Sequence, residues 1–134
     1  MELQHFIGKN QLSAIKSACK GEEGEYFMQK IRSLITQIET MPKTYETDGH
    51  GDEAIAALHY FNGGSDWYII ERDAGSPDDV IQGIQQQAFG LVRLNGYETE
   101  IGYISIQELI ENNVEIDLYY TPKTIKAIKA KYQK

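Results

Sequence analysis

The sequence contains one cysteine, Cys19, and only three prolines among its 134 residues. A single cysteine excludes an intramolecular disulfide, and a chain of this length buries enough surface to fold without one. The surrounding residues, SAIKSACK, place Cys19 on a predicted helix as a small apolar side chain. Nothing in this stretch marks the thiol as a catalytic nucleophile.

Long apolar runs are also missing from the sequence. No stretch approaches the roughly 20 apolar residues that a membrane-spanning helix requires. The first ten residues, MELQHFIGKN, lack the positively charged start and the apolar run of a signal peptide. We therefore expect a cytoplasmic protein without a membrane segment.

Basic residues are concentrated at the C-terminal end of an otherwise acidic chain. The formal net charge is −7, and the last fourteen residues contain five lysines and no acid, which leaves −12 for residues 1–120. An acidic body repels the phosphate backbone, so duplex nucleic acid is a poor partner for it. The lysines are typical of a solvated helix face, and a weak nucleic-acid contact is the alternative interpretation.

The residue patterns predict a single α+β domain over residues 1–134. Residues 1–45 form a helical part, with a helix over 11–20 capped by Asn10 and a second over 24–41 whose apolar residues recur at helical spacing. Residues 54–120 form the sheet part, in which apolar and polar residues alternate. Thr121-Pro122 begin a C-terminal helix over 121–134. We expect a mainly antiparallel five-stranded sheet with helices packed on one face.

Two turns organise the predicted strands. The stretch Asn62-Gly63-Gly64-Ser65 has the glycines of a phosphate cradle, but it runs into a strand rather than a helix N-terminus, so we interpret it as a bend between strands. Asn95-Gly96 is typical of a type I′ turn, which predicts Arg93 opposite Glu98.

Two helices are predicted within the sheet part. SPDDVIQGI, beginning at Ser76, has the start signals of a short helix. Ser105 and Glu108 form a capping box for a helix through about Glu111. The last predicted strand, VEIDLYY, covers residues 114–120.

One loop has side chains that could bind a metal. TDGHGDEA brings Asp48, His50, Asp52 and Glu53 together in sequence, and carboxylates with imidazole suit a divalent ion. Their spacing fits neither a calcium loop nor a zinc motif. A solvated loop is therefore the better interpretation, and we predict no cofactor.

Carboxylates also follow an aromatic residue on a predicted strand. Strict alternation would place Glu71 and Asp73 on the same face as Trp67, with Glu100 nearby if the two hairpins are adjacent. Such a pair could raise one carboxyl pKa for acid catalysis. The same side chains would equally form an acidic binding patch, and no nucleophile motif accompanies them.

Aromatic residues are plentiful, with nine tyrosines and one tryptophan. Tyr and Trp are enriched at protein interfaces, and Tyr119-Tyr120 are the pair that we expect to be exposed.

The order and spacing of many residues between about 55 and 125 carry a family resemblance. They are Trp67-Tyr68-Ile69, Glu71, Asp73, Phe89-Gly90-Leu91-Val92, Glu100, Gly102-Tyr103, Ser105, Glu108-Leu109, Glu115, Asp117-Leu118 and Pro122. With these residues the chain resembles a family of short plasmid, phage and integrative-element proteins, domain of unknown function 2958. It departs at Ile116, where the family pattern has a basic residue, and the first fifty residues lie outside the match. The resemblance implies a mobile-element accessory protein, in a setting where anti-defence functions are common, and it implies no catalytic residues.

We therefore expect a non-enzymatic protein-interaction module whose acidic, aromatic-rich surface binds a host or element-encoded protein. An anti-defence role or mimicry of nucleic-acid charge is the sharper version of this hypothesis. The predicted binding residues are Trp67, Glu71, Asp73, Glu100, Tyr119 and Tyr120. The alternative is a metal-dependent hydrolase or other enzyme, with Asp48, His50 and Asp52 as the candidate metal ligands.

Overall fold

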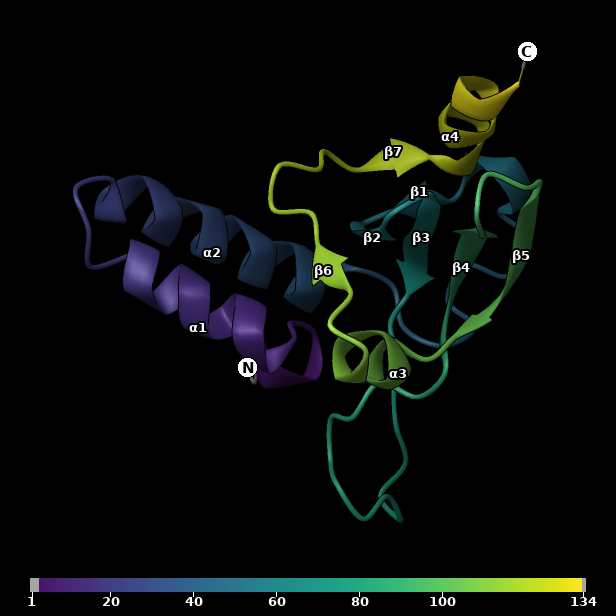
Figure 1. The fold of residues 1–134 in the computed structure, drawn as a ribbon. Coiled ribbons are helices and arrows are strands. Elements are labelled where there is room, and N and C mark those ends of the chain that lie inside the picture. Colours follow the sequence, from purple (N-terminus) through teal and green to yellow (C-terminus); the bar gives the residue numbers. More distant parts are fainter. Residues whose placement is uncertain (1–2, 134) are drawn as a thin grey trace.

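The computed structural model of the protein describes residues 3–133 and has the α+β fold that the sequence predicts (Figure 1). Its helices are η1 (Leu3–His5), α1 (Lys9–Ala18), α2 (Gly24–Thr40), η2 (Gly51–Glu53), α3 (Ile106–Glu111) and α4 (Ile125–Tyr132). Its strands are β1 (Ile55–Ala56), β2 (Leu58–Asn62), β3 (Ser65–Glu71), β4 (Ala88–Arg93), β5 (Thr99–Ile104), β6 (Glu115–Ile116) and β7 (Lys123–Thr124). No helix among these residues is both long and apolar enough to cross a lipid bilayer.

The main sheet has five antiparallel strands in the order β5-β4-β3-β2-β6, which confirms the predicted sheet. The stretch interpreted as a bend joins β2 to β3, with Asn62 opposite Ser65 and Gly63 at φ +57°. A separate pair of antiparallel strands, β1 and β7, joins the start of the sheet part to the two residues before α4.

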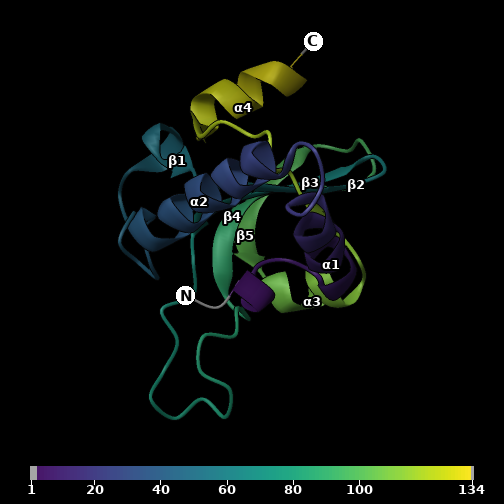
Figure 2. The same ribbon diagram turned by 90° about the vertical axis from the view of Figure 1, so that its left-hand side faces the viewer.

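The two faces of this sheet are covered by different helices. Leu58, Tyr60 and Ile69 point to the α2 face, where they pack with apolar residues of α1, α2 and α3. Tyr68, Ile70 and Leu91 point to the α4 face and pack against Ile125 and Ile128. Figure 2 shows α1 and α2 lying across one side of the sheet. We predicted that the helices pack on one face of the sheet, but α4 packs on the opposite face from α2. The strands are buried on both faces, so both faces need cover.

A β-bulge in β3 changes the direction of one predicted site residue. Ile69 lies opposite Gly90, whereas Glu71 lies opposite Phe89, so the register shifts between them. A bulge adds one residue to one strand and reverses the alternation beyond it. Glu71 therefore turns to the α4 face, and the predicted common face for Trp67 and Glu71 is wrong.

The β4–β5 hairpin keeps its predicted turn but not its predicted register. Asn95 and Gly96 both have positive φ, 52° and 79°, and the N–H of Tyr97 donates to the carbonyl of Leu94 at 2.9 Å, as a type I′ turn requires. The loop contains one more residue on its β5 side, so Arg93 pairs with Thr99 instead of Glu98.

The helix predicted from Ser76 does not form. Its start signals build a single turn, in which the N–H of Asp79 donates to the carbonyl of Ser76 at 3.1 Å. The chain then remains irregular up to β4, since Val80 and Ile81 meet no core and a short helix without a buried face is marginal.

Smaller differences concern element ends. The N-cap of α1 is Gly8 rather than Asn10, and the N-cap of α4 is Thr124 rather than Thr121. The last predicted strand shortens to β6, because the Asp117 carboxylate bonds the N–H of Tyr119 and turns the chain.

Candidate functional site: the open edge of the sheet

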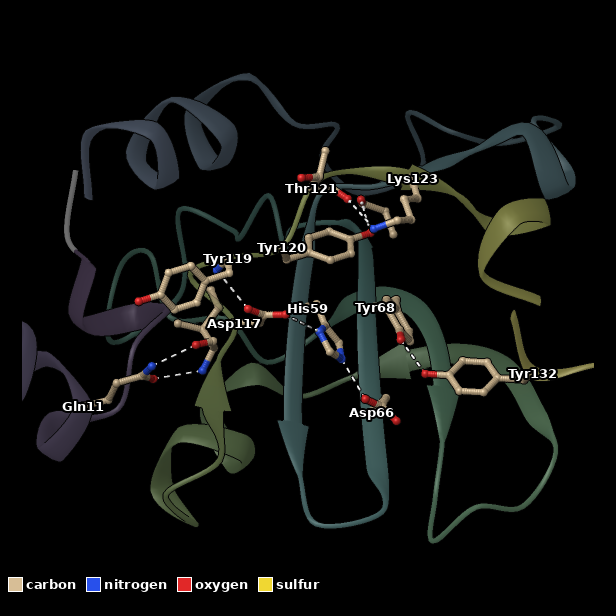
Figure 3. Close-up of polar contacts among 12 residues, drawn as sticks. Gln11, His59, Asp66, Tyr68, Asp117, Tyr119, Tyr120, Thr121, Lys123 and Tyr132 are labelled. Carbon is tan, nitrogen blue, oxygen red and sulfur yellow. Dashed lines mark hydrogen bonds and ion pairs between the residues drawn. The ribbon is translucent and has the colours of Figure 1, made fainter. Parts of the chain in front are cut away.

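One edge of the main sheet, β6, is short and protected. The side-chain amide of Gln11 in α1 donates to the carbonyl of Ile116 at 2.8 Å and accepts the N–H of the same residue at 2.9 Å (Figure 3). This amide occupies the backbone groups that a further strand would use. The β6 edge is therefore closed to strand addition.

A carboxylate–imidazole–carboxylate chain lies beside this closed edge (Figure 3). The Nδ1 atom of His59 is 3.1 Å from Oδ2 of Asp117, and its Nε2 atom is 2.8 Å from Oδ1 of Asp66. The ring also stacks on Tyr68, with centroids 4.4 Å apart. Both ring nitrogens are therefore engaged within the protein, and the carboxylate–imidazole–carboxylate chain joins β2 and β3 to the segment after β6.

A groove of about 460 Å³ lies between the carboxylate–imidazole–carboxylate chain and α4. The Tyr120 hydroxyl in it donates to the carbonyl of Ala56 at 2.8 Å, and burial raises the pKa of Tyr120 to about 12. Lys123 at the rim lies 5.0 Å from the centre of the Tyr120 ring and donates to the Thr121 carbonyl. These groove groups already have partners within the protein.

The opposite edge of the sheet, β5, is longer and has no such cover. It is six residues long, pairs with β4 on one side, and has no strand partner on the other side among the described residues. About half of the N–H and C=O groups of an antiparallel edge strand point away from its neighbour. Ile101 and Tyr103 project from β5 to the α4 face and are 46% and 59% exposed, and Glu100 is exposed on the α2 face.

Tyr45 completes this surface beside β5. It is 65% exposed and has a φ of 68°, a conformation that is rare for an aromatic residue. A hydrogen bond with the Tyr45 side chain raises the pKa of Tyr103. We call Tyr45, Glu100, Ile101 and Tyr103 the open-edge surface; Ile101 and Tyr103 lie on its α4 side, and Glu100 lies on its α2 side.

Glu71 lies behind this surface as a support. It is 4% exposed, and its carboxylate accepts the N–H groups of Tyr45 (2.8 Å) and Thr47 (3.0 Å) and the Thr47 hydroxyl. A carboxylate with these three donors fixes the backbone around Tyr45. Glu71 is therefore a structural residue and not part of an exposed acidic patch.

The other predicted binding residues are distributed over the molecule. Asp73 lies at the base of the loop before β4, where it accepts backbone N–H groups of Gly75 and Gln87. Trp67 is half-buried and shares a row of the α2 face with Val92 and Glu100.

The tyrosine pair separates at the end of β6. Tyr119 is 63% exposed, with the Lys30 ammonium 5.0 Å from its ring centre, and Tyr120 turns into the groove beside His59. The structure therefore brings only Glu100, of the six predicted residues, into the open-edge surface.

The candidate metal ligands lie in an exposed turn region without converging. Asp52 forms an ion pair with Lys129 of α4 at 2.9 Å, while Asp48 and His50 are exposed. Within residues 3–133, no three His, Cys, Asp or Glu side chains are placed to hold a metal ion.

The sequence interpretation missed two structural features, namely the position of His59 between Asp66 and Asp117 and the closure of β6 by Gln11. The two-residue turn Gly63-Gly64 fixes Phe61 opposite Asp66, and that register alone would have placed His59 on the same face as Asp66. No local signal could have indicated Gln11, because its partner is 105 residues away.

Comparison with protein-family models, with curated proteins and with solved structures found no match to this chain.

Proposed function

We propose that this chain is a non-enzymatic protein-interaction module that binds an extended segment of another protein along β5. The single observation that carries the proposal is the contrast between the protected β6 edge and the β5 edge, which has no outer strand partner within residues 3–133 and exposes Ile101 and Tyr103. Natural sheets protect long apolar edges, so an unprotected one suits a partner strand.

The chemistry of the edge defines the partner. Residues 97–104 contain Glu98 and Glu100 and no Lys, Arg or His. Residues 1–120, which include these two glutamates, have a formal net charge of −12, and this charge opposes pairing between two copies. The expected partner segment is therefore extended, apolar at alternate positions and basic beside Glu98 and Glu100.

The biological setting of the proposal is an accessory protein of a mobile genetic element that acts in the cytoplasm on a host or element-encoded protein. Its support is the resemblance of residues 55–125 described above, and an anti-defence role is the sharper form. Substitution of Glu71 or Asp73 would not test this idea cleanly, because both side chains hold loops in place.

The test begins with capture from nuclease-treated lysate of the source cells. The bait is the wild-type protein, and its variant is Ile101→Lys/Tyr103→Lys, which adds charge to the edge. Tyr26→Lys/Met28→Lys on α2 is the matched control, since both residues are exposed and the charge change is equal. We expect the edge variant to lower affinity for the purified partner at least about 100-fold, because it removes a central apolar contact.

Hydrogen exchange of the purified complex then distinguishes strand addition from side-chain contact alone. Amides of β5 that exchange rapidly in the isolated protein should become protected in the complex. Equal partner binding by the edge variant, or unprotected β5 amides, would overturn the proposal. A wild-type dimer that the edge variant converts to a monomer would identify a second copy as the occupant instead.

A further inference from the structure

The loop between β3 and β4, residues 73–87, extends away from the sheet and helices in both views (Figures 1 and 2). Its tip presents two neighbouring β-branched residues to solvent: Val80 is 100% exposed and Ile81 is 53% exposed. Water contact with apolar side chains is unfavourable, so their display at one protruding point calls for an explanation.

The base of this loop is built to hold its two ends together. One oxygen of the Asp73 carboxylate accepts the N–H of Gly75 at 2.8 Å, and the other accepts the N–H of Gln87 at 3.0 Å. A single side chain thus joins the first and last residues of the loop.

The Gln85 amide strengthens the same base. Gln85 is 2% exposed; it accepts the N–H of Asp73 at 2.7 Å and donates to the carbonyls of Asp73 and Gly83. A loop with joined ends and a buried amide at its base keeps its shape without a partner.

The tip has its own polar support. The Gln82 side chain donates to the carbonyls of Ser76 (3.1 Å), Pro77 (3.4 Å) and Asp79 (3.0 Å). The N–H of Ser76 donates to the Asp79 carboxylate at 2.8 Å. Because the backbone is already ordered, little conformational entropy would be lost when this loop binds.

Charge identifies the kind of surface that the tip fits. Residues 73–87 contain three aspartates, of which Asp78 and Asp79 directly precede Val80, and no Lys, Arg or His. An apolar pocket with a basic rim would match both the exposed side chains and the charge. We infer that this loop is a second contact with the partner protein and inserts Val80 and Ile81 into such a pocket.

This inference rests on the proposed function, and its test uses the partner purified there. Val80→Ala should weaken binding about 10-fold, because a buried anchor is lost. Met28→Ala on α2 is the matched control, since Met28 is also an exposed apolar side chain, 39% accessible, and it should leave affinity unchanged. Thermal melting should not change for Val80→Ala, because the native side chain is fully exposed.

The charge of the rim is tested separately. Asp78→Lys should weaken binding about 10-fold at low salt and less at high salt, because it faces basic residues of the partner. Glu22→Lys makes the same charge change at the exposed α1–α2 turn and should have little effect. A photoreactive phenylalanine analogue at position 80 should cross-link to apolar partner residues that adjoin Lys or Arg.

The outcomes separate the two proposals. Weaker binding by β5 variants with unchanged binding by Val80→Ala and Asp78→Lys would overturn the loop inference and leave the proposed function in place. Tighter binding by Asp78→Lys, or cross-links to an acidic surface, would contradict the inference that the partner's pocket has a basic rim. Failure of the wild-type protein to bind any partner would overturn both.

Discussion

The two edges of the main sheet differ in length, in cover and in what lies behind them. At β6 the strand is only two residues long, and the Gln11 amide takes up the outward N–H and C=O of Ile116. At β5 the strand is six residues long, has β4 as its only strand partner in the described part of the chain, and leaves Ile101 and Tyr103 exposed. This fold therefore protects one edge with a side chain distant in sequence and leaves the other edge accessible.

The largest effect on stability is expected behind the open edge. Glu71→Ala leaves two backbone N–H groups and the Thr47 hydroxyl without their acceptor, which should lower the free energy of unfolding by about 4 kcal/mol. Urea denaturation measures the change. Glu98→Ala, at an exposed loop position, should stay within about 0.5 kcal/mol of the wild type. Similar values for the two variants would show that Glu71 does not support Tyr45.

Beside the closed edge, removal of the His59 imidazole should lower the free energy of unfolding nearly as much. His59→Ala leaves Asp66 and Asp117 facing each other without the imidazole, which should cost about 3 kcal/mol of unfolding free energy. His50→Ala removes an exposed imidazole and is the control in the same urea experiment. A small effect of His59→Ala would mean that the β2–β6 side is held by apolar packing alone.

The closure of the β6 edge can be removed directly. Gln11→Ala exposes the N–H and C=O of Ile116 and should cost about 1–2 kcal/mol, since two hydrogen bonds are lost. Gln29→Ala in α2 controls for helix propensity, because the Gln29 side chain makes a single long hydrogen bond among the described residues, to the Glu25 carboxylate at 3.4 Å. Faster amide exchange at Ile116 in Gln11→Ala, with no change at β5, would sharpen the contrast between the edges.

The smallest expected effect is a pH dependence at Tyr120. Its pKa is raised to about 12 by burial, above an unfolded value of about 10, so folding favours the neutral hydroxyl. The resulting stability is fully present below pH 10 and is lost as the pH rises from 10 to 12. Tyr120→Phe should differ from the wild type by a constant amount at pH 7–9 and lose less stability above pH 10, as measured by urea denaturation. Parallel curves up to pH 12 would contradict the raised pKa.

In the sheet part, local sequence patterns predicted some features correctly and others incorrectly. The Asn95-Gly96 turn was predicted with its positive φ values, yet the pairing of Arg93 was wrong by one residue. Turn chemistry acts on the two central residues, whereas register also depends on how the following residues pack. Likewise, the alternation around Trp67 was correct up to Ile69 and failed at Glu71, because a bulge has no reliable sequence signature here.

Local sequence patterns were enough to predict the α+β class, the five strands of the sheet, the long amphipathic helix α2 and the turn at Gly63-Gly64, because these follow from periodicity and backbone preference within a few residues. Local patterns could not predict which face of the sheet α4 covers, that Glu71 is buried, or that Gln11 closes the β6 edge and leaves the β5 edge accessible. Those outcomes depend on contacts between segments up to 105 residues apart, which local preferences do not encode.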